Sequence, residues 1–399
     1  MDLSTWHAGA FITAVCGAPG ALLLLEVCLA RRRTGESSSD EPLLRPTFRV
    51  LIPAHDEAAG IGACLEALIP LLPSPSTALV VADNCSDETA SIATAFGVEV
   101  LVREASELRG KGYALKYGLD HLSQAPPDCV VFLDADCSYL RGGPSDLAAL
   151  AVASGRPAQG LFLMDPPSES SLGARAAAFA VRVKNDLRAR GLSQLGGAVS
   201  LQGSSFALSW DACSAVSPPV DELAEDAVWG WRLADKGWPP LFSTQTACSG
   251  QLASGREANQ IQRARWERGT LLGAWRVLPG VFVRSLMRGR LAVSVLALDG
   301  LVPPLSLLAF ACSVWALVGV QTGISFAQAV APISILASGV LISWLRVGRD
   351  LIAPYELVGL LAHGFARICR FPATILSGSE WRRTPRDGAV EAHDHSIKD

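Results

Sequence analysis

Residues 130–140 read VVFLDADCSYL, an apolar run that leads directly into two aspartates separated by one alanine. Residues i and i+2 of a strand point to the same side, so Asp134 and Asp136 are expected to converge at the end of a strand over 130–136. Two carboxylates this close repel each other unless a cation lies between them, and hard oxygen ligands suit Mg²⁺ or Mn²⁺. Because a bare D-x-D pattern is common, a polar turn at a strand end is the competing interpretation.

The same order of apolar run and polar segment recurs on the N-terminal side of this stretch. Apolar runs occupy 48–54, 78–83, 98–102 and 130–136, and helical periodicity occurs over 58–68, 87–96 and 112–122. This alternation predicts an α/β fold with a mainly parallel sheet, whose ligands bind at the carboxyl ends of the strands. His55, Glu57, Asp83 and the two aspartates all follow such ends.

The sequence contains neither of the glycine-rich phosphate motifs expected at the first turn of a nucleotide-binding fold. Residues 54–57 read AHDE in place of G-x-G-x-x-G, and the RGKG of 109–112 lacks the first glycine and the final Ser or Thr of a P-loop. Lys111 can still meet a phosphate as a point charge. The net charge of −4 argues against a nucleic-acid partner, and the histidines show no zinc-binding spacing.

The N-terminal region is apolar enough to anchor the chain in a membrane. Residues 8–30 contain one charge, and at 1.5 Å per residue they reach about 35 Å, against a bilayer core of about 30 Å. A cleaved signal peptide is the alternative, but no Lys or Arg precedes the run and three arginines follow it at 31–33. We therefore predict an anchor over 1–33, a linker over 34–46, and a cytoplasmic location for the chain from residue 34 onward.

Two further uncharged spans, 301–320 and 324–345, predict a transmembrane hairpin with arginines beyond both ends. The expected organisation is a soluble domain over 47–255, a segment with an interfacial helix over 256–290, the hairpin region over 291–345, and an interfacial or re-entrant helix with a tail over 346–399. The chain is therefore predicted to be a multi-pass protein of the plasma (inner) membrane. Because the spans contain no charge, a transporter is disfavoured.

Several motifs, in order, resemble those of the family 2 glycosyltransferases, in the membrane branch related to cellulose, chitin and hyaluronan synthases. They are LIPAHDE (51–57), VVADNCSDET (80–89), RGKGYALKYGL (109–119), FLDADC (132–137), the E-D helix LAEDAVWGWRLADKGW (223–238) and the Q-x-x-R-W segment QRARW (262–266). The resemblance covers about residues 48–270 and implies a GT-A-type nucleotide-sugar-binding domain. Asp56 stands where the family usually has Asn, which leaves its role open.

The resemblance also implies which residues hold the donor. Asp83 should meet the nucleoside, expected to be uridine, and the turn containing Pro53, Ala54 and Glu57 should line the same pocket. Lys111 and Asp134 are assigned to the nucleotide sugar, and Asp134 and Asp136 to Mg²⁺ or Mn²⁺ on its diphosphate. For Asp83 the alternative is a helix N-cap, a position that Asp87 fits better.

An inverting displacement also needs a base for the acceptor hydroxyl, and Asp226 is the candidate. Glu225 points about 100° away from it on a helix and can orient the site. Gln262 and Arg265 share a helix face and can offer a donor and a cation to the acceptor or diphosphate, and the resemblance implies that Trp266 stacks near the acceptor sugar. Gly203 can place backbone beside the acceptor, with a plain turn as the alternative. The alternatives are an acidic first turn that the helix dipole favours, and a basic surface helix with a membrane-facing tryptophan.

Together these features predict a membrane-anchored inverting glycosyltransferase that moves a sugar from a UDP-sugar to a growing β-glycan of the exopolysaccharide type. Two alternatives stay open, namely single-sugar transfer to a lipid acceptor and a non-catalytic membrane scaffold with a degenerate transferase domain. The expected partners are the donor, a glycan or lipid acceptor, the bilayer, and either a second copy of the chain or an export partner.

Overall fold

The computed structural model describes residues 3–30, 45–166, 170–252 and 256–360. The strands in these ranges are β1 (Phe48–Ala54), β2 (Ala78–Asp83), β3 (Glu99–Arg103), β4 (Cys129–Phe132), β5 (Ser138–Arg141), β6 (Ala158–Asp165), β7 (Phe206–Ser209) and β8 (Leu241–Gln251). The helices of the N-terminal half are α1 (Leu3–Leu29), α2 (Ile61–Leu68), η1 (Ile69–Leu71), η2 (Pro75–Thr77), α3 (Thr89–Ala95), α4 (Lys111–Leu122), α5 (Pro144–Ser154), α6 (Leu172–Arg182), the π-helical η3 (Val183–Arg188) and α7 (Ala189–Leu195). They are followed by α8 (Trp210–Ala215), α9 (Glu225–Lys236), α10 (Arg256–Met287), α11 (Leu291–Gly300), α12 (Leu305–Gln321), α13 (Phe326–Val347) and η4 (Pro354–Glu356).

The strands form one mixed sheet in the order β3-β2-β1-β4-β7-β6-β8-β5. The pairings β3-β2, β2-β1, β1-β4 and β6-β8 are parallel, whereas β4-β7, β7-β6 and β8-β5 are antiparallel. The predicted α/β fold with a mostly parallel sheet is therefore confirmed. Its antiparallel pairings involve β5 and β7, which are four residues long and too short to show a clear periodicity.

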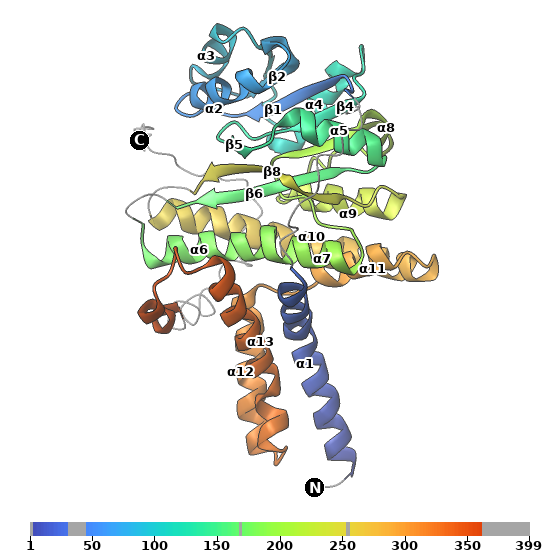
Figure 1. The fold of residues 1–399 in the computed structure, drawn as a ribbon, viewed down its shortest axis with the longest axis vertical. Coiled ribbons are helices and arrows are strands. Elements are labelled where there is room, and N and C mark those ends of the chain that lie inside the picture. The colour runs from blue at the N-terminus through green and yellow to red at the C-terminus, as the bar shows by residue number, and fades with distance from the viewer. Residues whose placement is uncertain (1–2, 31–44, 167–169, 253–255, 361–399) are drawn as a thin grey trace, which may run out of the picture.

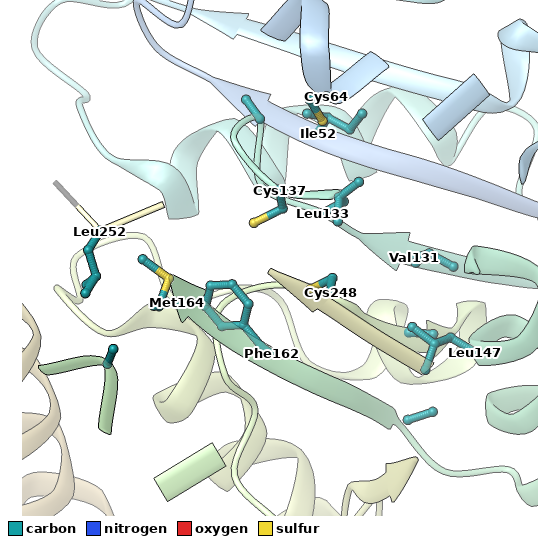
Figure 2. Close-up of a cluster of buried hydrophobic side chains, with 14 of the residues drawn as sticks. Ile52, Cys64, Val131, Leu133, Cys137, Leu147, Phe162, Met164, Cys248 and Leu252 are labelled. Carbon is teal, nitrogen blue, oxygen red and sulfur yellow. The ribbon is translucent and has the colours of Figure 1, made fainter. Parts of the chain in front are cut away.

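Both faces of the central strands are buried, which explains their nearly continuous apolar sequences. Val50 and Ile52 of β1 belong to one hydrophobic cluster, and Leu51, between them, belongs to the cluster on the opposite face. Figure 2 shows the first cluster, where Ile52 and Leu133 lie above Phe162 and Cys248. The central strands are thus covered on both sides and end at a well-defined edge.

The strand expected over 130–136 is shorter than predicted, because β4 ends at Phe132. Beyond it Leu133, Ala135 and Cys137 remain buried, while Asp134 and Asp136 are partly exposed. The peptide N–H of Cys137 donates to the carbonyl of Asp134 at 3.1 Å and closes a turn. The carboxylates are therefore brought together by a turn whose apolar residues are buried, not by a continuing strand.

Two groups of helices lie below the sheet in Figure 1. A layer of α6, α7, α10 and α11 lies directly beneath it, and α1, α12 and α13 extend away from this layer side by side. Helix α10 continues from the Q-x-x-R-W segment through the region predicted to be interfacial. That interfacial placement stays a prediction.

Two helices are long and apolar enough to cross a membrane, with candidate spans Gly9–Leu29 and Phe326–Val347. Helices α11 and α12 pass the same test only as a pair bent by 77°. Arg346 at the end of α13 donates to the carbonyls of Val27 and Ala30, so it caps the last turn of α1. Most of the predicted linker, and the tail beyond residue 360, lie outside the described residues.

Helix α1 also packs closely against the soluble domain at Gly191 of α7. A Cβ atom at this glycine would lie 2.3 Å from the carbonyl oxygen of Glu26. No real side chain tolerates such a contact, so the glycine allows the two helices to approach each other.

We expect Gly191→Ala to lower the free energy of unfolding by about 1–3 kcal/mol, because the added methyl forces α1 away from α7. Thermal unfolding of the detergent-solubilised protein measures this change. Gly60→Ala is the control, since its Cβ would meet no atom closer than 3.9 Å. Equal melting temperatures for the two variants would contradict the close contact.

Candidate active site

A cavity of about 830 Å³ opens at the carboxyl ends of β1 and β2 and at the turn after β4. Every residue that the sequence analysis assigned to donor, metal, acceptor or base lines it, namely Pro53, Ala54, Glu57, Asp83, Lys111, Asp134, Asp136, Gly203, Glu225, Asp226, Gln262, Arg265 and Trp266. These side chains come from segments more than 200 residues apart in the chain. The fold therefore gathers all the predicted site residues around one space.

Asp83 lies at the end of β2, where its carboxylate is held by two neighbours. Arg103, its register partner on β3, donates to Oδ1, and the amide of Asn84 donates to the same oxygen at 3.0 Å. Burial raises the pKa of Asp83, while Arg103 and His55 oppose this rise. The carboxylate is therefore fixed in orientation at the wall of the cavity.

Asp83 is not the N-cap of α3, because this helix begins only at Thr89. Instead the Oδ1 atom of Asp87 accepts a hydrogen bond from the peptide N–H of Thr89 at 3.0 Å. Asp87 thus satisfies a backbone donor at the start of α3, as its place in the sequence suggested.

Asp56, the departure from the family pattern, has a structural role outside the cavity lining. Its backbone is left-handed with φ of 51°, a conformation that Asp and Asn adopt more readily than most residues. Its Oδ1 accepts hydrogen bonds from the peptide N–H of Ser86 at 2.6 Å and from the Ser86 hydroxyl at 3.1 Å. An aspartate therefore holds the first two loops of the site together.

Lys111, at the start of α4, lies where several elements meet. Its Nζ is 2.6 Å from Asp134 Oδ1 and 3.4 Å from Glu225 Oε1, and it donates to the carbonyl of Gly203 at 2.7 Å. Burial disfavours the charge on this lysine, yet Asp134, Glu225 and Asp226 together raise its pKa. The ammonium group remains charged and ties the D-x-D turn to α9 and to the loop around Gly203.

The D-x-D turn has the donor set that a hard divalent cation needs. Asp134, Asp136 and Cys137 each offer one ligand atom, and these atoms lie within 4.8 Å of one another. A hydrogen bond with Cys248 and burial raise the pKa of the Cys137 thiol well above its usual value, so it is protonated and a poor ligand. The two carboxylates remain, and their oxygens fit Mg²⁺ or Mn²⁺.

The two acids of the E-D pair begin α9 and approach different partners. Glu225 pairs with Lys111, and burial raises its pKa to about 7 although the lysine opposes the shift. Asp226 lies against Gly203, where a Cβ atom would be 3.5 Å from its Oδ2. Gly203 has φ of 90°, so its own backbone conformation also requires a glycine.

Burial raises the pKa of Asp226, and Lys111 and Lys184 oppose the rise. Asp226 therefore holds its proton more strongly than an exposed aspartate does. A carboxylate with a raised pKa is a stronger base than an exposed aspartate, which suits it to accept a proton.

The loop around Gly203 is positioned by Gln159, a residue that the sequence interpretation missed. This side chain is fully buried on β6; its amide donates to the carbonyl of Ser204 at 2.9 Å, and its Oε1 accepts from the peptide N–H of Gln202 at 2.8 Å. Ser204 Oγ in turn accepts from the peptide N–H of Asp134 at 3.0 Å. A polar residue inside an apolar strand was the available signal.

One wall of the cavity is formed by α10, on which Gln262, Arg265 and Trp266 occupy adjacent turns. Gln262 is buried and Trp266 packs partly against the main hydrophobic cluster. Arg263 donates to the carbonyl of Gly173 at 2.8 Å, so this wall is attached to α6. The Q-x-x-R-W segment therefore faces the same space as the D-x-D turn.

The cavity continues toward α1 and toward the bend between α11 and α12. The sequence interpretation did not anticipate this continuation. Its lining there includes Leu23 of α1, Lys184 and Arg188 of η3, Asp299 of α11, and residues 302–306. Arg188 Nε donates to Glu26 Oε2 at 2.9 Å, and another nitrogen of the same guanidinium pairs with Asp299. The single charge in the N-terminal apolar run was the signal for this buried ionic group.

The model of the glycosyl transferase family 2 matches residues 49–156. These residues form a glycosyltransferase family 2 domain. The domain contains the D-x-D turn, Asp83 and Lys111, whereas α9 and α10 lie beyond the matched range.

Curated relatives resemble only part of the chain. A low-salt glycan biosynthesis hexosyltransferase of Haloferax volcanii is 31% identical over 130 residues, which cover 28% of this chain and 30% of that protein. The 4,4'-diaponeurosporenoate glycosyltransferase of Staphylococcus aureus is 33% identical over 98 residues, covering 24% of this chain and 25% of that protein. The chain thus spans less than a third of either relative.

A solved structure shares the fold over almost the whole chain. The mannosyltransferase of Pyrobaculum calidifontis, in complex with GDP-Man and Mn²⁺, superposes with a TM-score of 0.55 and covers 92% of this chain and 98% of its own, at 17% sequence identity. The glycosyltransferase domain therefore has a GT-A-like α/β fold, and the likeness of fold extends to the flanking helices.

We expect Arg188→Met to lower the free energy of unfolding by about 3–5 kcal/mol, because it leaves Glu26 and Asp299 as uncompensated carboxylates in a buried site. Urea unfolding in detergent measures the loss. Arg276→Met is the control, since Arg276 is 61% exposed in its pair with Glu222 and should contribute less than about 1 kcal/mol. If both variants lose the same small amount, the buried group does not join α1 to the glycosyltransferase domain.

Proposed function

We propose that the protein is a metal-dependent inverting glycosyltransferase that takes a sugar from a UDP-sugar and passes it to an acceptor at the membrane face. One observation carries this proposal: a single cavity contains the D-x-D carboxylates, Lys111 and Asp226. A donor diphosphate and an acceptor hydroxyl bound there would meet the charges that the reaction needs within one water-restricted space.

The donor occupies the half of the cavity near the strand ends in this proposal. Asp83, held by Arg103, faces the nucleoside, and the Pro53–Glu57 turn closes the same side. Asp134 and Asp136 would hold Mg²⁺ or Mn²⁺, which supplies positive charge for the departing diphosphate. Lys111 contributes a second, fixed positive charge beside it.

The transfer step is a single displacement at the anomeric carbon. The acceptor oxygen forms a new bond to this carbon from the face opposite the diphosphate, and the bond between the carbon and the diphosphate oxygen breaks, with its electron pair leaving on UDP. The acceptor proton passes to the Asp226 carboxylate. Glu225, bound to Lys111, keeps the start of α9 in place during this step.

The shape of the cavity supports a lipid as the acceptor. It extends from the donor residues to Leu23 on the candidate span of α1 and to residues 302–306 at the bend between α11 and α12. A growing β-glycan remains the second candidate, because Trp266 lines the cavity and offers a flat surface for a sugar ring. The few candidate spans favour the lipid, since a polymer needs a path across the bilayer.

We propose a cytoplasmic location for the glycosyltransferase domain in a multi-pass protein of the inner membrane. The C-terminal end of α1 lies against Gly191 of α7, and Arg182 of α6 donates to the carbonyl of Val347 at the end of α13, so both helices end beside the domain. Arginines follow both helices, at 31–33 and at Arg346 and Arg349. Positive charges cluster on the cytoplasmic side of membrane proteins, so both helices support the same orientation.

We expect Asp226→Asn to lower UDP release by about 10²–10⁴-fold, because the acceptor hydroxyl loses its base. Release of UDP from UDP-glucose and UDP-N-acetylglucosamine by the purified protein, with Mn²⁺ and membrane lipids, is the measurement. Asp120→Asn is the control, since Asp120 is exposed on α4 and pairs only with Lys116 among the described residues. Absence of turnover in the wild-type protein with every donor would support the non-catalytic scaffold instead.

We expect Asp136→Asn to raise the Mn²⁺ concentration needed for half-maximal activity by at least about 10-fold, because one of two anionic ligands becomes neutral. Titration of metal into the chelator-treated protein, followed by UDP release, gives this value. An unchanged metal requirement in this variant would contradict the assignment of the D-x-D turn as the metal site.

A further inference from the structure

The membrane-side half of the cavity contains no residue that the donor needs, and its lining is largely apolar. Leu23 of α1, Ala177 and Val181 of α6, and Val302 and Leu305 at the bend between α11 and α12 face this part. An apolar chain placed here would be removed from water along its length, which is favourable for each buried methylene. The lining therefore suits the chain of a lipid.

Three charged side chains line the same cavity as Asp226, and Lys184 is close enough to feel its charge. They are Lys184 and Arg188 of the π-helical segment η3, and Asp299 at the end of α11. Short π-helical segments inside α-helices often occur at functional sites, because they turn neighbouring side chains toward a common space. Here the η3 segment brings both Lys184 and Arg188 to the cavity.

The two cations differ in what they contact. Arg188 is engaged by Glu26 and Asp299. Lys184 makes no hydrogen bond or ion pair with any residue in the described part of the chain, although its side chain is exposed to the cavity. Burial among protein atoms lowers its pKa, while Asp226 and Asp299 oppose this effect. Lys184 is therefore a hydrogen-bond donor available to a bound molecule.

The charges around Lys184 decide which head group fits. Glu26 and Asp299 both engage Arg188. With Lys184 and the neighbouring Asp226 included, this group has two positive and three negative side chains. A phosphate bound here would add negative charge to a group in which carboxylates already outnumber cations. A hydroxyl group can instead accept a hydrogen bond from the lysine and donate one to a carboxylate, and it leaves the charge balance unchanged.

We propose that the acceptor is a lipid with an uncharged, hydroxyl-bearing head group, which Lys184 holds beside Asp226 while the lipid chain lies against Leu23 and Val302. This inference rests on the proposed glycosyltransferase function and specifies its acceptor. Lys184 is an acceptor-binding residue, and it orients the head so that one hydroxyl proton points to Asp226. The donor contacts of Asp83, Lys111 and the D-x-D turn are independent of it.

The first test separates acceptor binding from donor binding. Lys184→Met should raise the KM for a lipid acceptor by about 10- to 100-fold, the effect expected when a hydrogen bond from a charged donor is lost. The Kd for the UDP-sugar with Mn²⁺, measured by calorimetry on the same protein, should stay at the wild-type value. Lys184→Arg should recover part of the acceptor affinity, because it retains a cationic donor.

Lys116→Met is the matched control, since Lys116 is an exposed lysine on α4 that pairs with Asp120 outside the cavity. Both the acceptor KM and the donor Kd should be unchanged in this control. The inference is overturned if Lys184→Met leaves the acceptor KM unchanged, or if it weakens donor binding as much as acceptor binding.

The second test compares head groups on identical chains. Detergent-dispersed dioleoylglycerol and polyprenol are offered beside their phosphate esters, and a soluble oligosaccharide is included. We expect glycosylation of at least one neutral lipid, and no product from either phosphate ester or from the oligosaccharide, by mass spectrometry of the extracted products. Preference for a phosphate ester or for the oligosaccharide, or UDP release without any glycosylated neutral lipid, would overturn the inference.

These outcomes remain separate from a failure of the proposed function. If the wild-type protein releases no UDP from any donor, with or without acceptors, then glycosyl transfer itself is wrong. If it turns over a donor but the head-group comparison gives one of the contrary results, glycosyl transfer stands and only the acceptor assignment fails.

Discussion

The candidate site depends on one partly buried cation, the ammonium group of Lys111. It contacts Asp134 from the turn after β4, Glu225 from the start of α9 and the carbonyl of Gly203. Several carboxylates in one cavity repel each other, so without a positive charge among them the three segments would separate. The lysine reduces this repulsion and holds the donor-binding turn and the candidate base at fixed positions.

A second buried ionic group has a comparable role at the other end of the cavity. Arg188 joins Glu26 of the candidate membrane span to Asp299 of α11, and Gly191 allows α1 to approach α7 closely. Helix α1 therefore contributes to the site as well as being a candidate membrane span, since Leu23 forms part of the cavity wall. This arrangement explains why a charge is retained in an otherwise apolar span.

The two ends of the cavity differ in how far they are covered by the known family. The glycosyltransferase family 2 model matches residues 49–156, which contain Asp83, Lys111 and the D-x-D turn, and the resemblance to a solved mannosyltransferase extends over the flanking helices as a likeness of fold. The elements outside the matched range, α9, α10 and η3, contribute Asp226, Trp266 and Lys184 to the cavity. The residues that we assign to the acceptor therefore lie outside the range that the family model matches.

Local sequence was sufficient wherever a residue's role depends on its place on a strand or helix. The apolar runs at 48–54 and 78–83 predicted parallel strands, and a polar residue after each run had to lie at the same edge of the sheet, so Glu57 and Asp83 could be placed without coordinates. The three apolar spans were likewise evident from length and composition, although α12 meets the criteria only together with the bent α11.

Only the tertiary structure decided contacts between segments distant in sequence. Gln159 supports the Gly203 loop, Arg103 fixes Asp83, and Glu26 meets Arg188 across 162 residues, none of which a local pattern encodes. The continuation of the cavity to α1, α11 and α12 likewise depends on contacts between distant segments. Periodicity within a segment reports which side of it is buried, whereas the partner of a buried polar group depends on how the segments pack, and that is determined by the whole fold.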